Sequence, residues 1–190
     1  MNKDSDRAPA AGPPCRVRRR FDGDLDACVQ ALAAVHGHSG YPVNWPEDPG
    51  GWLTPSSLLA AWVAEVDGRV VGHVGLSRSG TDDLAPGLWG SREGVDADRA
   101  AVVNRLFVAP TARARGIGAL LLAQAVREAR ARGLHPVLDV VVSDTAAAAL
   151  YERMGWEHLA TVAQQWGPRQ TVAVRCYAGP VPAPQPSQAD

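Results

Sequence analysis

Two glycines that follow a basic turn are the residues with the clearest capacity for chemistry. They lie in the segment 106–121, LFVAPTARARGIGALL, which combines a short apolar strand, a polar turn and the start of an amphipathic helix. The first turn of a helix leaves N–H groups without partners, and the helix dipole adds partial positive charge there. Because glycines also let an anion approach the backbone, this segment predicts a binding site for a phosphate-bearing ligand.

Two common phosphate-binding motifs do not match this turn, and their absence limits the kind of phosphate ligand. The phosphate loop of nucleotide hydrolases ends in Gly-Lys-Ser/Thr, but Lys3 is the only lysine of the chain. A dinucleotide fingerprint needs a small residue three places after its second glycine, where this chain has Leu121. The pattern that remains, Arg-x-x-Gly-x-Gly, is filled by Arg113, Gly116 and Gly118. It resembles the pyrophosphate-binding signature of the GNAT N-acetyltransferase family, which uses acetyl-coenzyme A.

A second segment extends the resemblance to the same family. The run 136–142, PVLDVVV, has the length and β-branched composition of a strand, and 144–156, DTAAAALYERMGW, follows it. This order is similar to the family's second cofactor segment, in which a strand precedes Asn-x-x-Ala and a helix ending in Leu-Tyr-x-x-x-Gly-Phe. Asp144 stands at the usual Asn position and Trp156 at the usual Phe position. An Asp caps a helix as Asn does, although a carboxylate suits a phosphate ligand less well.

The resemblance implies where the cofactor binds. The pantetheine arm would run beside the strand backbone at 106–108, and the pyrophosphate would bind the backbone amides of 114–118. Arg113 or Arg115 would add charge-assisted hydrogen bonds, although a solvated helix face is an equal alternative for Arg115. The implied cofactor-binding residues are Leu106, Phe107, Val108, Arg113, Ala114, Arg115, Gly116, Ile117, Gly118, Asp144, Ala147 and Tyr151.

The reaction implied by the resemblance is direct attack of an uncharged amine on the acetyl thioester. By analogy with the family, the backbone N–H of Val108 would stabilise the oxyanion. Tyr151 would be the acid that protonates the departing thiolate, because a phenol with an ordinary pKa of about 10 is neutral at pH 7. Activity would then rise with pH as the amine deprotonates and fall as the phenol ionises. Packing beside Leu150 and Met154 is the alternative role of Tyr151, and no metal ion is expected.

The sequence leaves the general base open. Many family members carry a carboxylate inside the fourth strand, but this chain has VVN at 102–104. A water chain is one alternative. His73 is either a core histidine or a base, and Asp139 either a base or a group that orients the substrate cation. The candidate bases are Glu65, His73, Glu93, Asp96, Asp98 and Asp139.

The acceptor is expected to be a primary amine of a small molecule or a peptide. The region 36–52, HGHSGYPVNWPEDPGGW, is long and stiffened by prolines. Tyr41 and Trp45 are candidate walls of an acceptor pocket, with Asp139 as a further substrate-binding residue, and the loop 79–97 is a candidate opposite wall. A surface loop held down by its own aromatic residues is the alternative. Either a monomer or a homodimer fits the chain.

The elements that must position these residues alternate between strand and helix. Periodicity and turn residues predict strands near 15–21, 62–66, 70–76, 102–108, 136–142, 157–163 and 171–178. They also predict four helices: over 24–37, from Thr54-Pro55 through Leu59, over 115–132 and from Asp144 onward. Asp67-Gly68 predicts a hairpin. The resemblance implies an α/β (α+β) fold with a mixed, mostly antiparallel sheet of about six or seven strands, splayed between strands 4 and 5, with helices on both faces.

Composition favours one cytoplasmic enzyme domain. The chain has 190 residues, 46% of them hydrophobic and 21% charged, and its net charge of −1 favours neither nucleic acid nor a membrane surface as a partner. We expect a single N-acetyltransferase domain over 14–178, a disordered segment over 1–13 and a Pro-rich flexible tail over 179–190. Three widely spaced cysteines predict free thiols, and neither a membrane span nor a signal peptide is recognised. A catalytically inactive acyl-coenzyme A sensor is the alternative function, against which the presence of Tyr151 argues.

Overall fold

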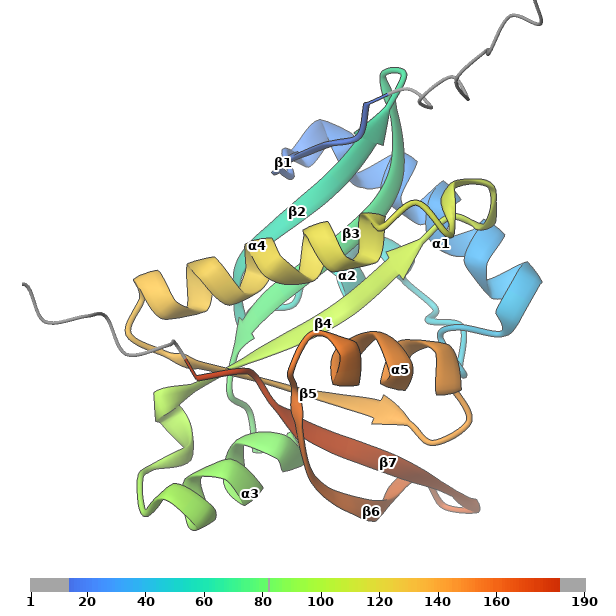
Figure 1. The fold of residues 1–190 in the computed structure, drawn as a ribbon. Coiled ribbons are helices and arrows are strands. Elements are labelled where there is room, and N and C mark those ends of the chain that lie inside the picture. The colour runs from blue at the N-terminus through green and yellow to red at the C-terminus, as the bar shows by residue number, and fades with distance from the viewer. Residues whose placement is uncertain (1–13, 82, 182–190) are drawn as a thin grey trace, which may run out of the picture.

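The computed structural model describes residues 14–81 and 83–181, so the predictions made for 1–13 and for most of the tail lie outside it. The described residues form one seven-stranded sheet with the order β1-β2-β3-β4-β5-β7-β6 (Figure 1). Its strands are β1 (Arg16–Arg19), β2 (Leu58–Val66), β3 (Arg69–Arg78), β4 (Ala100–Val108), β5 (His135–Val141), β6 (Glu157–Gly167) and β7 (Gln170–Ala178). All neighbours pair antiparallel except β4 and β5, which are parallel. The sheet is therefore mixed and mostly antiparallel, as the family resemblance implied.

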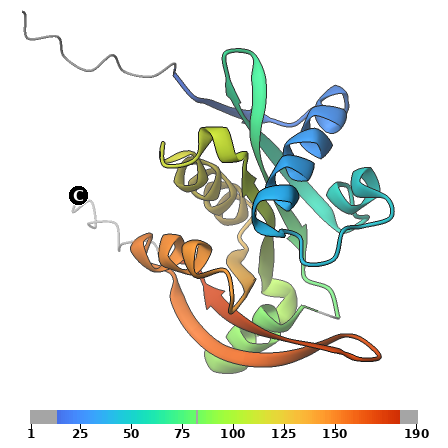
Figure 2. The same ribbon diagram turned by 90° about the vertical axis from the view of Figure 1, so that its right-hand side faces the viewer.

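Helices cover both faces of this sheet (Figures 1 and 2). They are α1 (Leu25–Ser39), α2 (Pro49–Leu53), α3 (Leu84–Glu93), α4 (Ile117–Ala131) and α5 (Thr145–Arg153), with short 3-10 turns at Asp22–Asp24, Ala97–Arg99 and Pro110–Ala112. On one face, α1 and α2 pack around Val63 and Phe107, and α3 packs on Val102 and Val137. On the other face, α4 and α5 share the largest buried cluster, which includes Tyr151. The site described below lies where the two layers meet an opening in the sheet.

That opening is the divergence of β4 from β5. The two parallel strands pair only at Ala100↔His135, Ala101↔Pro136 and Val102↔Val137. Beyond these pairs the carboxyl ends of the strands separate (Figure 1). The splay expected between strands 4 and 5 is therefore confirmed, and it leaves one edge of β4 without a neighbouring strand.

Two turn predictions are confirmed by backbone conformation. Asp67 and Gly68 have φ of 50° and 73° and join β2 to β3, which is the left-handed pair that a tight hairpin requires. Gly133, with φ of 69°, follows α4 at the point where the sequence predicted its end.

Other local predictions were wrong. Thr54-Pro55 does not start a helix, because β2 already begins at Leu58, and the short helix lies earlier, at α2, capped by the Asp48 side chain. Asp24 stands at the N-cap of α1 without capping it, because its carboxylate binds Arg18 instead.

The predicted loop 79–97 contains the helix α3, whose Gly87, Gly90 and Pro86 hid the helical pattern. Leu120, predicted on the buried stripe of α4, is 48% exposed. The buried face of α4 runs instead through Ile117, Leu121, Leu122, Ala125, Val126 and Ala129.

Candidate active site

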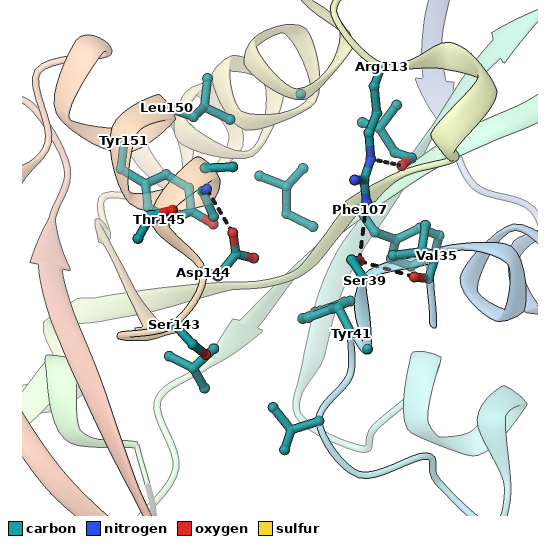
Figure 3. Close-up of a pocket in the computed structure, with 18 residues that line it drawn as sticks. Val35, Ser39, Tyr41, Phe107, Arg113, Ser143, Asp144, Thr145, Leu150 and Tyr151 are labelled. Atoms are coloured by element: carbon teal, nitrogen blue, oxygen red, sulfur yellow. Dashed lines mark hydrogen bonds between the residues drawn. The ribbon is translucent and has the colours of Figure 1, made fainter. Parts of the chain in front are cut away.

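A cavity of about 520 Å³ occupies the opening between β4 and β5. Its lining comes from the carboxyl ends of α1, β4 and β5, from the loop before α4, and from α5 (Figure 3). These segments are far apart in the sequence, and the sheet topology alone brings them together. The volume lies within the range of about 300–1,000 Å³ that is usual for small-molecule sites.

The edge of β4 presents polar backbone groups to this cavity. Ala109 N–H donates to Val71 O at 2.7 Å, and the register continues through Gly72↔Val108 and His73↔Phe107. In an antiparallel ladder the hydrogen-bonded and non-hydrogen-bonded pairs alternate. Val108 therefore belongs to a non-hydrogen-bonded pair, and its N–H and C=O point away from β3, into the opening. Leu106, two residues earlier, is oriented in the same way.

The loop before α4 forms the second wall. Ala114 and Gly116 have φ of 61° and 73°, and Gly116 is the N-cap of α4. Arg113 holds this loop in place, because its Nε donates to Val108 O at 3.4 Å and its Nη2 to Ser39 Oγ at 3.3 Å. The helix begins at Ile117, so the partnerless amides of its first turn lie at this end of the cavity.

Two residues of the basic turn have a packing role as well. The Ile117 side chain is 1% exposed and belongs to the core, so only its backbone N–H is available to a ligand. A Cβ on Gly118 would lie 3.2 Å from Leu150 Cδ2 and 4.0 Å from Val108 Cγ2. The absence of a side chain at Gly118 therefore lets α4, α5 and β4 approach one another around the cavity.

The helix α5 contributes a cap and a phenol to the third wall. Asp144 caps α5 as predicted, because its Oδ1 accepts from Ala147 N–H at 2.9 Å. Tyr151 lines the cavity although it is only 6% exposed (Figure 3). Its ring packs against those of Trp156 and Tyr177, at centroid distances of 6.0 Å and 5.8 Å. Burial raises the pKa of the Tyr151 phenol well above its ordinary value, so the hydroxyl stays protonated.

The segment between α1 and α2 supplies the fourth wall. Tyr41 lines the cavity, its ring meets the Trp52 ring edge-on at 6.3 Å, and burial raises the pKa of its phenol. Trp45 does not line the cavity: it is 40% exposed and packs on the His36 ring at 5.1 Å. The same segment is tied to the start of β7, because the side-chain amides of Asn44 and Gln170 donate to each other at 2.9 Å and 3.3 Å.

Asp139 is not brought together with these residues. It lies beneath α3, where burial raises the pKa of its carboxyl and hydrogen bonds from Cys176 and from the amides of Leu84 and Ala85 lower it. Asp139 thus lies against the start of α3 and is not one of the lining residues. Its Oδ1 is buried and has no hydrogen-bond partner in the described part of the chain.

Two of the candidate bases are held away from the cavity. His73 is fully buried, its Nε2 is 3.0 Å from Arg20 Nη1, its Nδ1 is 3.0 Å from Arg105 O, and burial lowers its pKa to about 3. Glu65 pairs with Arg18 at 2.9 Å. Within the residues that the structure describes, Asp144 is the single carboxylate of the lining.

The sequence missed several lining residues. Val35, Ser39 and Gly40 come from the end of α1, and Ser143 and Thr145 flank the cap of α5. The sequence predicted that the first helix ends near Gly37, whereas α1 continues to Ser39 and Gly40 is its C-cap. Nothing in the sequence indicated that this end would reach the opening. Among the described residues there is no cluster of three metal-ligating side chains, and no helix is long and apolar enough to cross a membrane.

Comparison with known proteins decides the family. The sequence profile of the acetyltransferase (GNAT) family matches residues 29–156, which is more than half of the chain. The chain belongs to the GNAT family. The matched range contains the end of β4, the loop before α4 and all of α5, the segments on which the resemblance was based.

Individual GNAT relatives are more distant. The chain is 36% identical over 97 residues to the probable N-acetyltransferase camello of Xenopus tropicalis, covering 50% of this chain and 37% of that protein. It is 32% identical over 107 residues to an uncharacterized N-acetyltransferase of Methanocaldococcus jannaschii, covering 56% of this chain and 42% of that protein. The matches thus span less than half the length of these relatives.

A solved structure agrees with the GNAT fold. The structure of Arabidopsis thaliana NAA60 in complex with acetyl-CoA superposes with a TM-score of 0.64 at 18% identity, covering 87% of this chain and 98% of that one.

Proposed function

We propose that this protein is an acetyl-coenzyme A-dependent N-acetyltransferase that acts on a primary amine of a small molecule or peptide. The observation that carries the proposal is the meeting of three groups in one cavity: the outward N–H of Val108, the protonated phenol of Tyr151 and the N-terminus of α4. Acetyl transfer requires a donor for the oxyanion, an acid for the leaving group and hydrogen-bond donors for the phosphates of the cofactor, which these three groups supply in that order.

The residues of the opening fit acetyl-coenzyme A. The edge of β4 offers the Leu106 and Val108 backbone to the amide groups of a pantetheine arm, in the way that a neighbouring strand would. The amides of the first turn of α4 and the Arg113 guanidinium suit a pyrophosphate. When bound, the cofactor supplies an acetyl thioester. The GNAT family, to which this chain belongs, uses acetyl-coenzyme A.

The side chains and backbone then have separate tasks. The amine nitrogen attacks the acetyl carbon, and the Val108 N–H donates to the oxygen on which negative charge develops. As the carbon–sulfur bond breaks, the sulfur takes the electron pair and receives the Tyr151 hydroxyl proton. The acceptor nitrogen must reach the cavity uncharged; after the attack it releases one proton to water and keeps the other as the amide N–H. The Tyr151 phenolate then regains its proton from water. The Asp144 carboxylate caps α5 and takes no part in these steps.

The experiment is a turnover screen combined with a binding assay. Acetyl-coenzyme A at a hundredfold excess over its dissociation constant is expected to stabilise the fold by about 2.7 kcal/mol, and adenosine, which lacks the pyrophosphate, by far less. Coenzyme A release is then measured with small amines, amino acids, polyamines, aminoglycosides and peptide N-termini. Release with any acceptor supports the enzyme. Binding without release from the whole panel would identify the protein as an acyl-coenzyme A sensor.

We also propose a cytoplasmic location for this activity. The described residues include three free cysteines, Cys15, Cys28 and Cys176, the last two of them buried. Unpaired thiols persist most readily in a reducing compartment. Detection of a tagged copy of the protein in a membrane-free cytoplasmic fraction would support this location, and its recovery from a secreted or membrane fraction would contradict it.

A further inference from the structure

We propose that Arg105 binds a carboxylate of the acceptor, so that the substrate is an amine that also carries a carboxylate, as amino acids do. This inference rests on the proposed function, because it concerns the acceptor of the same reaction. It starts from the place of Arg105 in β4, directly before Leu106, whose backbone faces the cavity.

The backbone at Arg105 directs its side chain to the face covered by α1 and α2. Arg105 has φ of 51°, a left-handed conformation that interrupts the β3–β4 register between His73 and Gly75. Its guanidinium stacks over the Trp52 ring, 4.9 Å from the centroid. The edge of the same tryptophan meets Tyr41, which lines the cavity. Arg105 is not itself a lining residue: it lies behind Tyr41 and Leu106, on the side of the cavity formed by the segment between α1 and α2.

The hydrogen-bonding capacity of this guanidinium is not used within the described chain. The cation–π contact with Trp52 satisfies none of the guanidinium N–H donors, which still need hydrogen-bond acceptors. Arg105 Nε is buried and has no hydrogen-bond partner in the part of the chain that the structure describes. A buried donor without an acceptor is costly, so the site is incomplete until an acceptor group arrives.

The surroundings of Arg105 favour an anion as that group. The half-buried Arg20 lies on the other side of His73, with its Nη1 3.0 Å from His73 Nε2. Burial lowers the pKa of Arg105, and the positive charge of Arg20 lowers it further. His73 itself is neutral, and Tyr41 keeps its proton. Asp83 is the carboxylate that opposes this charge within the described residues. A guanidinium fork in such a position is suited to a carboxylate, which it binds with two parallel hydrogen bonds.

The spacing is compatible with one small substrate. Arg105 lies three residues before Val108, so about 10 Å of strand separates them. A molecule with an amine at one end and a carboxylate at the other spans such a distance together with the long arginine side chain. The phosphates of the cofactor belong to the N-terminus of α4, on the opposite wall, so the two anionic ligands do not compete for Arg105.

The experiment compares amino acids with their amides, which keep the amine and lose the negative charge. Coenzyme A release is measured for a panel of α-amino and ω-amino acids with the wild type, Arg105→Gln, Arg105→Lys and Arg78→Gln, the last a control at an exposed arginine of β3. For each variant we compare kcat/KM for an amino acid with kcat/KM for its amide. The two substrates differ in amine basicity, but this difference is the same for every variant. It therefore cancels when the wild-type acid-to-amide ratio is divided by the variant ratio. Binding of each acid to the protein saturated with coenzyme A is measured by calorimetry.

In Arg105→Gln the ratio is expected to fall about 10- to 100-fold, with Arg105→Lys intermediate and Arg78→Gln like the wild type. Unchanged melting temperature and coenzyme A affinity show that the variant is folded. Release with a ratio that Arg105→Gln leaves unchanged would overturn the inference alone. Binding of acids that depends on Arg105, without release from any amine, would refute the proposed function and retain the inference. If neither release nor Arg105-dependent binding is observed, the proposed function and the inference are both refuted.

Discussion

Replacing Tyr151 with phenylalanine removes one oxygen from the cavity and leaves the packing of α5 in place. The ring keeps its neighbours Trp156 and Tyr177, at 6.0 Å and 5.8 Å, and its position in the largest buried cluster. The free energy of unfolding is therefore expected to change by no more than about 1 kcal/mol. If the hydroxyl protonates the leaving thiolate, turnover falls by about 10²- to 10⁴-fold. That loss corresponds to about 2.7–5.4 kcal/mol of activation free energy, well above the effect on folding.

The assay is coenzyme A release by the wild type and Tyr151→Phe between about pH 6 and pH 10. Both kcat and kcat/KM are expected to fall in the variant, because the proton is transferred only in the transition state. In the wild type, activity rises with pH as the acceptor amine deprotonates. Since burial raises the pKa of Tyr151 above the ordinary value of about 10, the phenol stays protonated throughout this range. The alkaline fall that an ordinary phenol would produce is therefore not expected.

Two outcomes would refute this reasoning. An unchanged kcat in Tyr151→Phe, with an unchanged melting temperature, would leave Tyr151 as a packing residue. An alkaline fall near pH 10 that disappears in the variant would show that Tyr151 titrates normally and that burial does not control its pKa. Coenzyme A affinity, measured in parallel, separates both outcomes from loss of the cofactor.

Three further perturbations test other parts of the site. Asp144→Asn retains the cap of α5 and removes a negative charge from the lining, so acetyl-coenzyme A should bind more tightly in a titration, whereas Asp144→Ala should cost about 1 kcal/mol in urea unfolding. In Gly116→Ala the new Cβ meets no neighbouring atom but the residue keeps a φ of 73°, so unfolding should become easier by about 1–2 kcal/mol. Gly118→Ala, whose Cβ would lie 3.2 Å from the movable Leu150 Cδ2 and 4.0 Å from Val108 Cγ2, should cost less. The reverse order would show that the left-handed backbone at Gly116 is not what requires glycine there. Because burial lowers the pKa of His73 to about 3, the unfolded chain binds more protons than the native protein below pH 6.5, and stability is lost as the pH falls from 6.5 towards 3. His73→Gln should flatten this dependence in unfolding titrations, while the exposed-site control His38→Gln should retain it.

Local signals in the sequence predicted the turn before α4 and the cap of α5 well. Gly116 and Asp144 act within their own turns, one through a left-handed φ and the other through a cap three residues long. Such features depend on residues that are adjacent in the sequence, so the local sequence was sufficient to predict them. The hairpin at Asp67-Gly68 was predictable for the same reason.

The surroundings of Asp139 and Arg105 could not be predicted, because their geometry depends on packing between segments that are distant in the sequence. The strand that carries Asp139 was predicted, but nothing in the sequence indicated that the start of α3 would lie against its carboxylate. Gly90 in α3 lowers helix propensity, yet a Cβ there would lie 2.6 Å from Val95 O, so close packing requires the glycine that disguised the helix. Arg105 gave no signal either, since its left-handed backbone and its stack on Trp52 arise only in the folded sheet.

The divergence of β4 and β5 places an unpaired strand edge inside the molecule. Exposed edges elsewhere promote aggregation, and proteins protect them with charge, short length or a covering segment. Here the edge at Leu106 and Val108 is recessed within a walled cavity, so another protein chain cannot add to it, whereas a narrow guest with alternating amide donors and acceptors can. In the function that we propose, the pantetheine arm of acetyl-coenzyme A takes the place of a neighbouring strand beside this edge. Its arrival would convert edge amides into interior ones, so occupancy of the site is recorded in the hydrogen-exchange protection of the backbone itself.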